Sequence, residues 1–554
     1  MEEIKRLLTD VCKQLFDLDI EPELTRPDVK FGDYTTNIAL VLSAKLNKTP
    51  RDVAVMISDK IDSTLISKID IAGPGFLNIS LTDEALVKTM SLAPTKPLLG
   101  QVVVAEYSDP NPFKVLHAGH LYTTLVGNTI GNLLEAAGAD VKRVNFGGDV
   151  GLHVAKAMWA IKRTIGKDNV DEFLAKIEYD LRAIWISQQY VEGNTAYDDS
   201  ESARLEITDV NKRVYELHNN GDKVSDFAKT YWTCRQWSYD GFENLYKNLG
   251  VKPFTKYYPE SQTTAAGLSA VDDLLEKGVL EKSEGAVVYA GEKDGLHTRV
   301  FINSNGLPTY EAKDLGLAVT KWQDYHFDKS IIITANDIVE YMKVVMAVVK
   351  SLSPEIAERS SHITHGIIKL AGGVKMSSRT GNALLAQDVL TATAEANKLA
   401  TGKNDVDVEL GAVKYAFLKQ RTGGDIIFDP ESSIKLEGNS GPYLQYAHAR
   451  ARSILSKKTL TEKQPITNLE GFERDLTRKV GEYQSIVSQA VTELMPHYIC
   501  TYLYELAQTF NRFYEQNKVI DDPRENIRLQ LVEAYANTLR SGLDLLSISA
   551  PEQM

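Results

Sequence analysis

Residues 102–138 have the sequence VVVAEYSDPNPFKVLHAGHLYTTLVGNTIGNLLEAAG, in which an apolar run is followed by a polar turn and a helical pattern. Val102–Tyr107 is mostly apolar, which is typical of a strand buried on both faces of a parallel sheet. From Ala118 onward the apolar residues recur at helical spacing, and Gly138 closes the pattern. The stretch therefore predicts a strand, a turn and a helix.

The turn contains the tetrapeptide HAGH, which begins at His117 and ends at His120. It lies where the predicted helix starts, and free backbone N–H groups and the positive end of the helix dipole favour a bound anion there. The position predicts a phosphate site that carries two imidazoles. One tetrapeptide is only suggestive, so the rest of the chain has to support it.

The same alternation continues beyond this stretch. DVKRVNF, followed by the turn Gly147-Gly148-Asp149, predicts a second strand, and KSIIIT at 329–334 predicts another buried parallel strand before a helix. Between them, 155–250 is helical in pattern and rich in aromatic residues, which helix packing explains better than RNA stacking. The chain therefore predicts a doubly wound nucleotide-binding sheet that is split by an insertion, with ligands beyond the carboxyl ends of its strands.

A second chemical motif follows in HGIIKLAGGVKMSSRTGN, where glycines bracket residues 375–379, KMSSR. One interpretation is a solvated basic loop. The other is a flexible clamp on a polyphosphate, in which Lys375 meets the charge of departing pyrophosphate and Ser377 and Ser378 donate hydrogen bonds.

The bulk composition is that of a multidomain globular protein. A length of 554 residues predicts three or four domains, and no apolar run approaches the length of a membrane span. The amino terminus is an amphipathic acidic helix rather than a signal peptide, so we expect a cytoplasmic protein. Three widely spaced cysteines argue against a zinc site, and a net charge of −13 argues against indiscriminate polyanion binding.

Two flanking regions leave alternatives open. In residues 1–92, which predict a small α+β domain, FGDYTTN is either a turn before a helix capped by Asp33 or Thr36, or part of a binding surface. After Val406 the strand signals stop. GPYLQYAHARARSILSKK then combines basic and aromatic residues, which suits single-stranded RNA and equally suits an ordinary amphipathic bundle.

HAGH and KMSSR, in that order on two halves of a split nucleotide-binding domain, resemble the class I aminoacyl-tRNA synthetases. The closer resemblance is to the arginyl-tRNA synthetase family. It covers essentially the whole chain through FGDYTTN, AGPGFLN, EYSDPNPFKVLHAGHL, NFGGDVGLH, LPTYEAKDLGLA, KMSSRTGN, EGNSGPYLQYAHAR and ISAPEQM. KMSSR departs from the commoner KMSKS, because Ser378 stands where the second lysine would fall.

The resemblance implies an α/β fold of the class I synthetase type, a Rossmann-type parallel sheet with a helical insertion. It also implies three domains: 1–92, an α+β domain that binds the tRNA elbow; 100–400, the catalytic domain with an insertion at about 155–295; and 406–554, an all-helical anticodon-binding domain.

The implied activity is that of an arginine–tRNA ligase. Arginine and ATP give arginyl-adenylate and pyrophosphate, and the arginyl group then passes to tRNA(Arg). The resemblance further implies Mg²⁺, no membrane association and adenylate formation that requires bound tRNA. We also expect a monomer.

The resemblance also implies site residues. For catalysis and ATP they are His117, Gly119, His120, Lys375, Met376, Ser377 and Ser378, with Lys114 as a partly redundant lysine; for arginine Glu106, Ser108, Asn111, Tyr310 and Asp314; for tRNA Asn37, Tyr443, Tyr446, His448 and Met554. Relatives usually carry a Gln after the strand KSIIIT, where this chain has ANDIVEY, so Asp337 or Asn336 is expected to take that place. No metal ligands are implied.

Three other functions fit parts of the sequence. A nucleotidylyltransferase of the HxGH type would not need about 150 further helical residues. A protein that only binds RNA would not need His117, His120 and Lys375 intact. Another class I synthetase, such as the cysteinyl type, would need a zinc-ligand cluster that these cysteines do not form.

Overall fold

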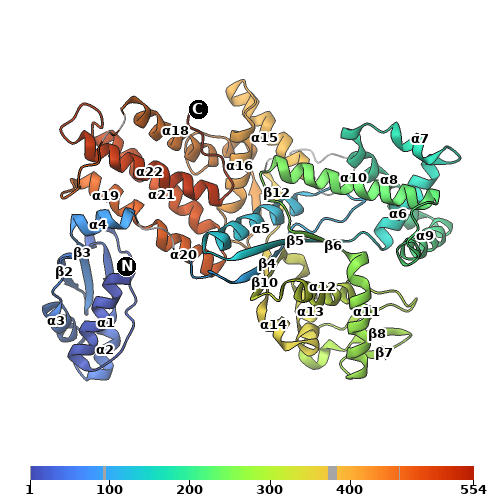
Figure 1. Cartoon of the computed structure of the whole chain (residues 1–554), viewed down its shortest axis with the longest axis horizontal. Coiled ribbons are helices and arrows are strands. Elements are labelled where there is room, and N and C mark those ends of the chain that lie inside the picture. Colours follow the sequence, from blue (N-terminus) through green and yellow to red (C-terminus); the bar gives the residue numbers. More distant parts are fainter. Residues whose placement is uncertain (1, 92–94, 372–383, 459, 461) are drawn as a thin grey trace.

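A computed structural model describes residues 2–91, 95–371, 384–458, 460 and 462–554. Figure 1 shows a small amino-terminal domain at one end, a helical carboxy-terminal region beside it, and a central sheet with its own helices beyond. None of the helices in the described part of the chain is long and apolar enough to cross a membrane.

The central sheet has five strands in the order β11-β10-β4-β5-β6, and all its neighbouring strands are parallel. The bounds are β4 Val102–Glu106, β5 Asp140–Gly147, β6 Lys256–Pro259, β10 Lys329–Ala335 and β11 Ser360–His365. The two strands predicted on either side of the insertion, β4 and β10, therefore lie next to each other. The order reverses between them, which creates the point where doubly wound sheets bind ligands.

Alternation along β4 explains why both faces of the sheet are covered. Val103 and Ala105 pack in one hydrophobic core with α5 (Ala118–Ala136) and the carboxy-terminal helices. Val104 points to the opposite face and belongs to a second core formed with α11 (Glu260–Glu276), α12 (Tyr310–Tyr325) and α13 (Val339–Leu352). A strand with apolar residues on both faces is what the sequence predicted.

Helices fill the connection between β5 and β6. They are α6 Leu152–Ile165, α7 Val170–Ala175, α8 Arg182–Asp199, α9 Glu201–Asn220 and α10 Asp226–Asn248. After α11 a small antiparallel sheet follows, made of β7 Glu281–Ser283, β8 Ala286–Tyr289 and β9 Arg299–Ile302. The strand β6 lies within the range expected for the insertion, yet it pairs with β5 at the edge of the central sheet.

The amino-terminal domain has a three-stranded antiparallel sheet flanked by helices. Its elements are α1 Glu2–Phe16, β1 Tyr34–Thr36, α2 Ile38–Leu46, α3 Pro50–Lys60, β2 Ile66–Ala72, β3 Phe76–Leu81 and α4 Asp83–Met90. FGDYTTN therefore contains a strand where the sequence suggested a turn. The N-cap position is Asn37, whose side chain makes no capping bond, but the hydroxyl of Thr36 accepts from the first helical N–H, that of Ile38, at 3.2 Å.

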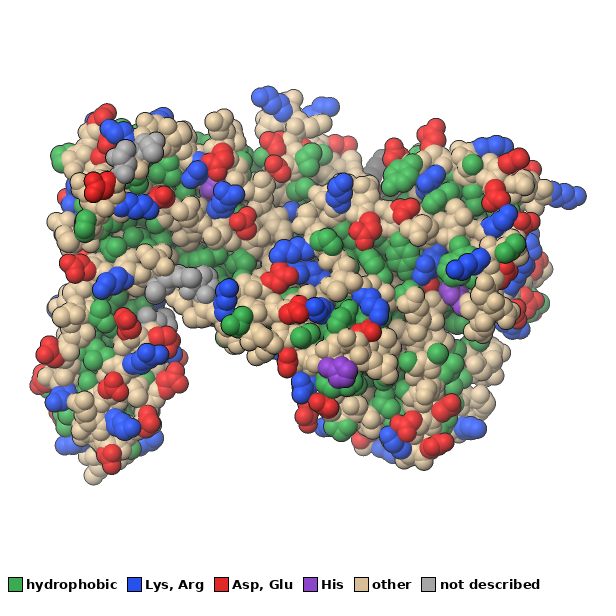
Figure 2. Space-filling view, in the orientation of Figure 1, with side chains coloured by type: hydrophobic (Ala, Val, Ile, Leu, Met, Phe, Trp, Pro, Cys, Tyr) green, Lys and Arg blue, Asp and Glu red, His purple; other side chains and the backbone are tan. Residues whose placement is uncertain are grey.

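Asp33 instead joins two domains. Its carboxylate accepts a bond from Arg474 at 2.6 Å on α19 (Gly471–Val480) and another from the backbone N–H of Leu81. Arg474 also pairs with Asp83 at the start of α4. In Figure 2 a hollow separates this domain from the part of the molecule that holds the central sheet, whereas α4 packs against α19 of the carboxy-terminal region.

The carboxy-terminal region is helical, with one exception. Its helices are α15 Ala386–Thr401, α16 Val406–Leu418, α17 Pro430–Ser433, α18 Gly441–Lys457, α19, α20 Tyr483–Glu493, α21 His497–Gln516 and α22 Glu525–Leu545. The exception is β13 (Ile426–Phe428), which pairs in parallel with β12 (Ile368–Leu370). The prediction that strands end at about Val406 is wrong at this position, because a strand of three residues is too short to give an alternating pattern. The short helix α14 (Pro354–Arg359) precedes β11.

Candidate active site

The candidate site lies at the carboxyl ends of β4 and β10. The loop that leaves β4 has three non-glycine residues with positive φ, Ser108 at 75°, Asp109 at 48° and Phe113 at 69°. Such conformations cost free energy and persist where the surrounding structure enforces them, which is common at functional sites. The loop is therefore held in a defined shape between the strand and the HAGH tetrapeptide.

HAGH forms the first turn of α5. His117 is the N-cap, its backbone N–H donates to Nδ1 of His120 at 3.3 Å, and the two ring centroids are 3.7 Å apart. A Cβ on Gly119 would come within 2.8 Å of the His117 ring, so a larger residue there would displace that ring. The two imidazoles are thus packed together at the helix N-terminus.

Both histidines are neutral in the free protein near pH 7. Burial lowers the pKa of His117, and the nearby Lys114 ammonium lowers it further. Burial lowers the pKa of His120 more strongly, with His117 as the next cause. A neutral imidazole offers one N–H donor, so these rings supply hydrogen bonds and the helix end supplies the positive potential.

Residues 375–379, which carry Lys375, Met376, Ser377 and Ser378, lie outside the described residues. The segment that follows them is described, and it pairs with HAGH. The Ala118 N–H donates to the carbonyl of Leu384 at 2.7 Å, and the Ala386 N–H donates to the carbonyl of Leu116 at 3.0 Å. The chain that leaves the second motif is therefore tied directly to the first motif.

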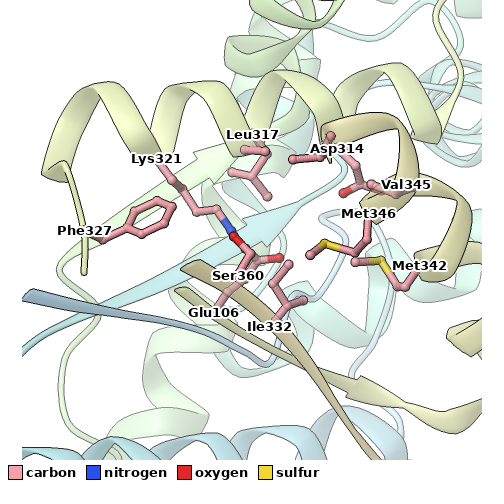
Figure 3. Close-up of a pocket in the computed structure, with 12 residues that line it drawn as sticks. Glu106, Asp314, Leu317, Lys321, Phe327, Ile332, Met342, Val345, Met346 and Ser360 are labelled. Carbon is pink, nitrogen blue, oxygen red and sulfur yellow. The ribbon is translucent and has the colours of Figure 1, made fainter. Parts of the chain in front are cut away.

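Glu106 and Asp314, both expected to bind arginine, line one cavity of about 20 Å³, which has room for roughly one water molecule. Figure 3 shows Glu106 in contact with Lys321 from α12, while Asp314 projects from the same helix at the other side of the cavity. The Asp314 carboxylate accepts a hydrogen bond from the Tyr341 hydroxyl on α13. Two carboxylates thus converge from different elements.

Burial raises the pKa of Asp314 to about 8, and the negative charge of Glu106 adds to the increase, while the Tyr341 hydrogen bond opposes it. Burial also raises the pKa of the neighbouring Asp109, with Glu106 as the next cause. A cluster of partly buried carboxyl groups with raised pKa is a favourable place for a cationic ligand, because the cation removes their mutual repulsion.

Two other expected arginine ligands face away from this cavity. The Ser108 hydroxyl is buried, where it bonds to Tyr246 at 2.8 Å and accepts from Thr124 at 2.7 Å. The Asn111 carboxamide oxygen accepts from the N–H of Gly148 at 2.8 Å. The Ser108 hydroxyl is thus saturated, whereas Asn111 keeps its amide N–H groups available.

The remaining expected site residues do not line this cavity. Tyr310 is 52% exposed at the start of α12, one turn before Asp314. Asp337 is exposed in the short 3-10 helix after β10, and its charge raises the pKa of His117 against the larger effect of burial. Lys114 lines a separate cavity of about 460 Å³ between α8, α10 and Leu385–Asp388.

The residues expected to contact tRNA lie far from this cavity and differ in exposure. Asn37 is partly exposed, and Tyr446 and Met554 are exposed. Tyr443 accepts a hydrogen bond from Asn511 at 2.9 Å. His448 differs from the expectation, because its ring is only 1% exposed and bonds to the carbonyl of Pro551 at 2.8 Å. The His448 ring holds the carboxy-terminal segment through Pro551, and a buried ring has no surface for RNA.

Sequence reasoning missed three polar residues that contact this site. Lys321 pairs with Glu106, Tyr341 bonds to Asp314, and the His365 ring accepts or donates a bond of 2.6 Å with Thr123 on α5. Burial lowers the pKa of His365 to about 4. The helical spacing of seven residues from Asp314 to Lys321 was the available signal, because it puts both on one face of α12.

A parallel sheet with HAGH at its switch point, a helical insertion and a helical carboxy-terminal region define a class I aminoacyl-tRNA synthetase. Family models match three parts of the chain: arginyl tRNA synthetase N terminal domain at 2–81, tRNA synthetases class I (R), catalytic domain, at 83–429, and DALR anticodon binding domain at 444–554. The catalytic-domain match alone covers more than half of the chain. The chain therefore belongs to the arginyl-tRNA synthetase family.

Relatives of known sequence agree with this membership. The arginine–tRNA ligase of Lactobacillus delbrueckii subsp. bulgaricus is 30% identical, over 97% of this chain and 96% of that protein. That of Flavobacterium psychrophilum is 29% identical over 98% and 97%. The arginyl-tRNA synthetase structure from Thermus thermophilus has the same fold over the full length of both chains, with a TM-score of 0.81 at 24% identity. The structure from Plasmodium falciparum has a TM-score of 0.79 at 21% identity.

Proposed function

We propose that Glu106 and Asp314 recognise the guanidinium group of arginine, in a cavity that widens from its present volume of about 20 Å³ when the group enters, and that the HAGH turn holds ATP. The chain is an arginine–tRNA ligase by family, so arginine, ATP and tRNA(Arg) are its substrates. The observation that carries the residue assignment is the convergence of two carboxyl groups on one cavity at the carboxyl end of β4, Glu106 buried and Asp314 partly buried. A planar guanidinium is best held by carboxylate oxygens in such a dry site.

The reaction requires in-line attack of the arginine carboxylate on the α-phosphate of ATP, with pyrophosphate leaving. Catalysis then depends on positioning and on neutralising charge, not on a covalent intermediate with the enzyme. His117 and His120 donate hydrogen bonds to the phosphates beside the N–H groups of α5. Lys375 stabilises the departing pyrophosphate, with Ser377 and Ser378 as further donors and Lys114 as a second cation.

Asp337 takes the α-amino group of arginine in this proposal. Its carboxylate is exposed at the carboxyl end of β10 and lies near enough to His117 to affect that ring's pKa. Asn111 adds amide donors, and Tyr310, one turn before Asp314 on α12, adds its hydroxyl. The substrate would thus lie across the switch point between β4 and β10.

Mg²⁺ enters with ATP in the same proposal, because this ion is usually held by phosphates together with one or two carboxylates. No group of three or more metal-binding side chains occurs within the described residues. When bound, the ion would neutralise charge on the phosphates.

The proposed function also involves tRNA. We propose that Asn37 contacts the tRNA elbow and that Tyr443, Tyr446 and Met554 contact the anticodon region, in a monomer that acts in the cytoplasm. We also propose the domain division at 1–92, 100–400 and 406–554, with an insertion at about 155–295.

The purified protein is expected to charge tRNA with arginine, and arginine-dependent exchange of pyrophosphate into ATP is expected only with tRNA present. The measurement is aminoacylation with each of the twenty amino acids, together with exchange assays with and without tRNA. Charging with a different amino acid would contradict the arginine assignment. Exchange without tRNA would contradict only the tRNA requirement.

Arginine binding is expected to weaken as the pH falls from 8 to 6. Asp314 is mainly protonated below its pKa of about 8 in the free protein, and a guanidinium requires the carboxylate form, so binding must release a proton. The apparent dissociation constant then rises by up to about tenfold per pH unit below 8. Calorimetry in two buffers of different ionisation enthalpy measures the proton release. No release at pH 6.5 would contradict the assignment of Asp314.

A further inference from the structure

Lys321, a buried lysine paired with Glu106, has no role in the proposed reaction so far. Lys321 is 3% exposed at its side chain and Glu106 is 5% exposed, and the ammonium donates to Oε2 of the carboxylate. The second partner of the ammonium is Oγ of Ser330, at 3.4 Å. Removing two charges from water is costly unless both are paired and hydrogen-bonded, so the position of this lysine is specific.

The sheet register places the Lys321 ammonium nearer the middle of the strands than the Glu106 carboxylate, away from the carboxyl ends where the substrate is proposed to bind. Ser330 pairs with Val104, whereas Glu106 pairs with Ile332, two residues nearer the carboxyl end of β10. The ammonium that bonds to Ser330 therefore approaches Glu106 from the interior of the sheet. Ligands of a doubly wound sheet lie beyond the carboxyl ends, on the other side of Glu106.

The carboxylate consequently has two different oxygens. Oε2 is occupied by Lys321, and Figure 3 shows the other oxygen turned away from the ammonium, into the cavity that Asp314 also lines. A carboxylate held at one oxygen cannot rotate freely, so the remaining oxygen keeps a fixed direction. Fixed acceptors are what geometric recognition of a guanidinium requires.

The charges around the cavity also indicate that Lys321 acts on the carboxyl groups that line it. Three carboxyl groups act on one another here, Glu106, Asp109 and Asp314, and the positive charge of Lys321 lowers the pKa of both Asp109 and Asp314 against the larger effect of burial. Glu260 on α11 also raises the pKa of Asp314. Lys313 on α12 pairs with Glu260 on α11 at 2.6 Å, and Tyr341 on α13 bonds to Asp314.

We propose that Lys321 is a positioning residue for arginine recognition: it fixes Glu106 from below and keeps the cavity anionic enough to accept one guanidinium. This inference rests on the proposed arginine site. Without the ammonium, the Glu106 carboxylate loses its hydrogen-bond donor and its fixed orientation, and a buried carboxylate without a countercharge is costly.

Lys321→Met is the test, because methionine has a similar length and suits a buried position. The Michaelis constant for arginine is expected to rise about tenfold to a hundredfold, as for loss of one partner of a buried charged bond, while kcat and the Michaelis constant for ATP change little. Lys321→Arg retains the charge and is expected to recover most of the loss. The pH dependence of arginine binding is expected to move to higher pH in Lys321→Met, because Asp314 also loses a positive neighbour.

A matched control is Arg143→Met on β5. Arg143 is also a buried cation on the central sheet, but its partners are Glu135 and Asn132 at the far end of α5. Its loss is expected to lower thermal stability without changing the Michaelis constant for arginine. If the Michaelis constant for arginine rose equally in both variants, Lys321 would have only a structural role.

Two further outcomes separate this inference from the proposed function. If Lys321 instead competed with arginine for Glu106, Lys321→Met would bind arginine more tightly, which would overturn the proposal. If Glu106→Gln and Asp314→Asn both left arginine binding unchanged, the proposed arginine site itself would be wrong. If those two variants weaken binding and a folded Lys321→Met does not, only the positioning role fails.

Discussion

Lys375→Ala is expected to slow arginyl-adenylate formation by about 10²–10³-fold, which is the effect of removing one group that stabilises charge developing in a transition state. Negative charge accumulates on pyrophosphate as it leaves, and the ammonium of Lys375 meets it only at that stage. The loss should therefore appear in kcat, whereas the affinity for tRNA should stay nearly unchanged. Single-turnover adenylate formation in the presence of tRNA measures the first quantity, and a binding titration measures the second.

Lys369→Ala is the matched control for this variant. Lys369 lies on β12, six residues earlier, and its ammonium is largely exposed and pairs with Asp425 at 3.3 Å. Its removal is expected to leave adenylate formation unchanged, because exposed ion pairs contribute little. Full activity of Lys375→Ala would transfer the role to Lys114, and Lys114→Ala in the Lys375→Ala background would then have to abolish activity.

Asp314→Asn is expected to lower kcat/KM for arginine by about a hundredfold or more, with little change in the Michaelis constant for ATP. The amide keeps the size of the side chain and can still accept from Tyr341, but it cannot supply the negative charge that pairs with a guanidinium. Losing one partner of a buried charged pair costs about 2–5 kcal/mol, which corresponds to this range. The proton release on arginine binding should disappear in the same variant.

Asp324→Asn separates this effect from a general loss of stability. Asp324 lies on the same helix ten residues further along, where it pairs with Lys256 at 2.6 Å and accepts from Tyr258. It is remote from the cavity in position and partners, so arginine kinetics should not change. A fall of less than about threefold in Asp314→Asn would place the guanidinium elsewhere.

The sequence alone was sufficient for the central fold and for the nucleotide motif. The apolar runs of β4 and β10, the helical spacing of α5 and the position of HAGH are local properties, and the structure confirms each of these elements. Period and composition reveal such features because each depends on residues close together in the chain. The three-residue strands β1 and β13 were not predicted from the sequence, because they are too short to show a period.

The partners of the recognition residues were decided only by the tertiary structure. Glu106 and Lys321 are 215 residues apart, and a lysine on a helix is usually a solvated residue, so the sequence favours no pairing. His448 is the converse case, since its basic neighbourhood suggested an RNA contact, yet the returning carboxy-terminal segment covers its ring. Whether a charged side chain is buried depends on which distant segments pack over it.

HAGH could thus be found from the sequence, because a helix N-terminus and two histidines occupy four consecutive residues. The shape and charge of the arginine cavity could not, because they depend on a strand order that brings β4 beside β10 and on the packing of α12, which supplies Asp314 and Lys321. Local pattern determines the elements and their ends. The low-dielectric interior, which decides which charges must pair, exists only once those elements have packed.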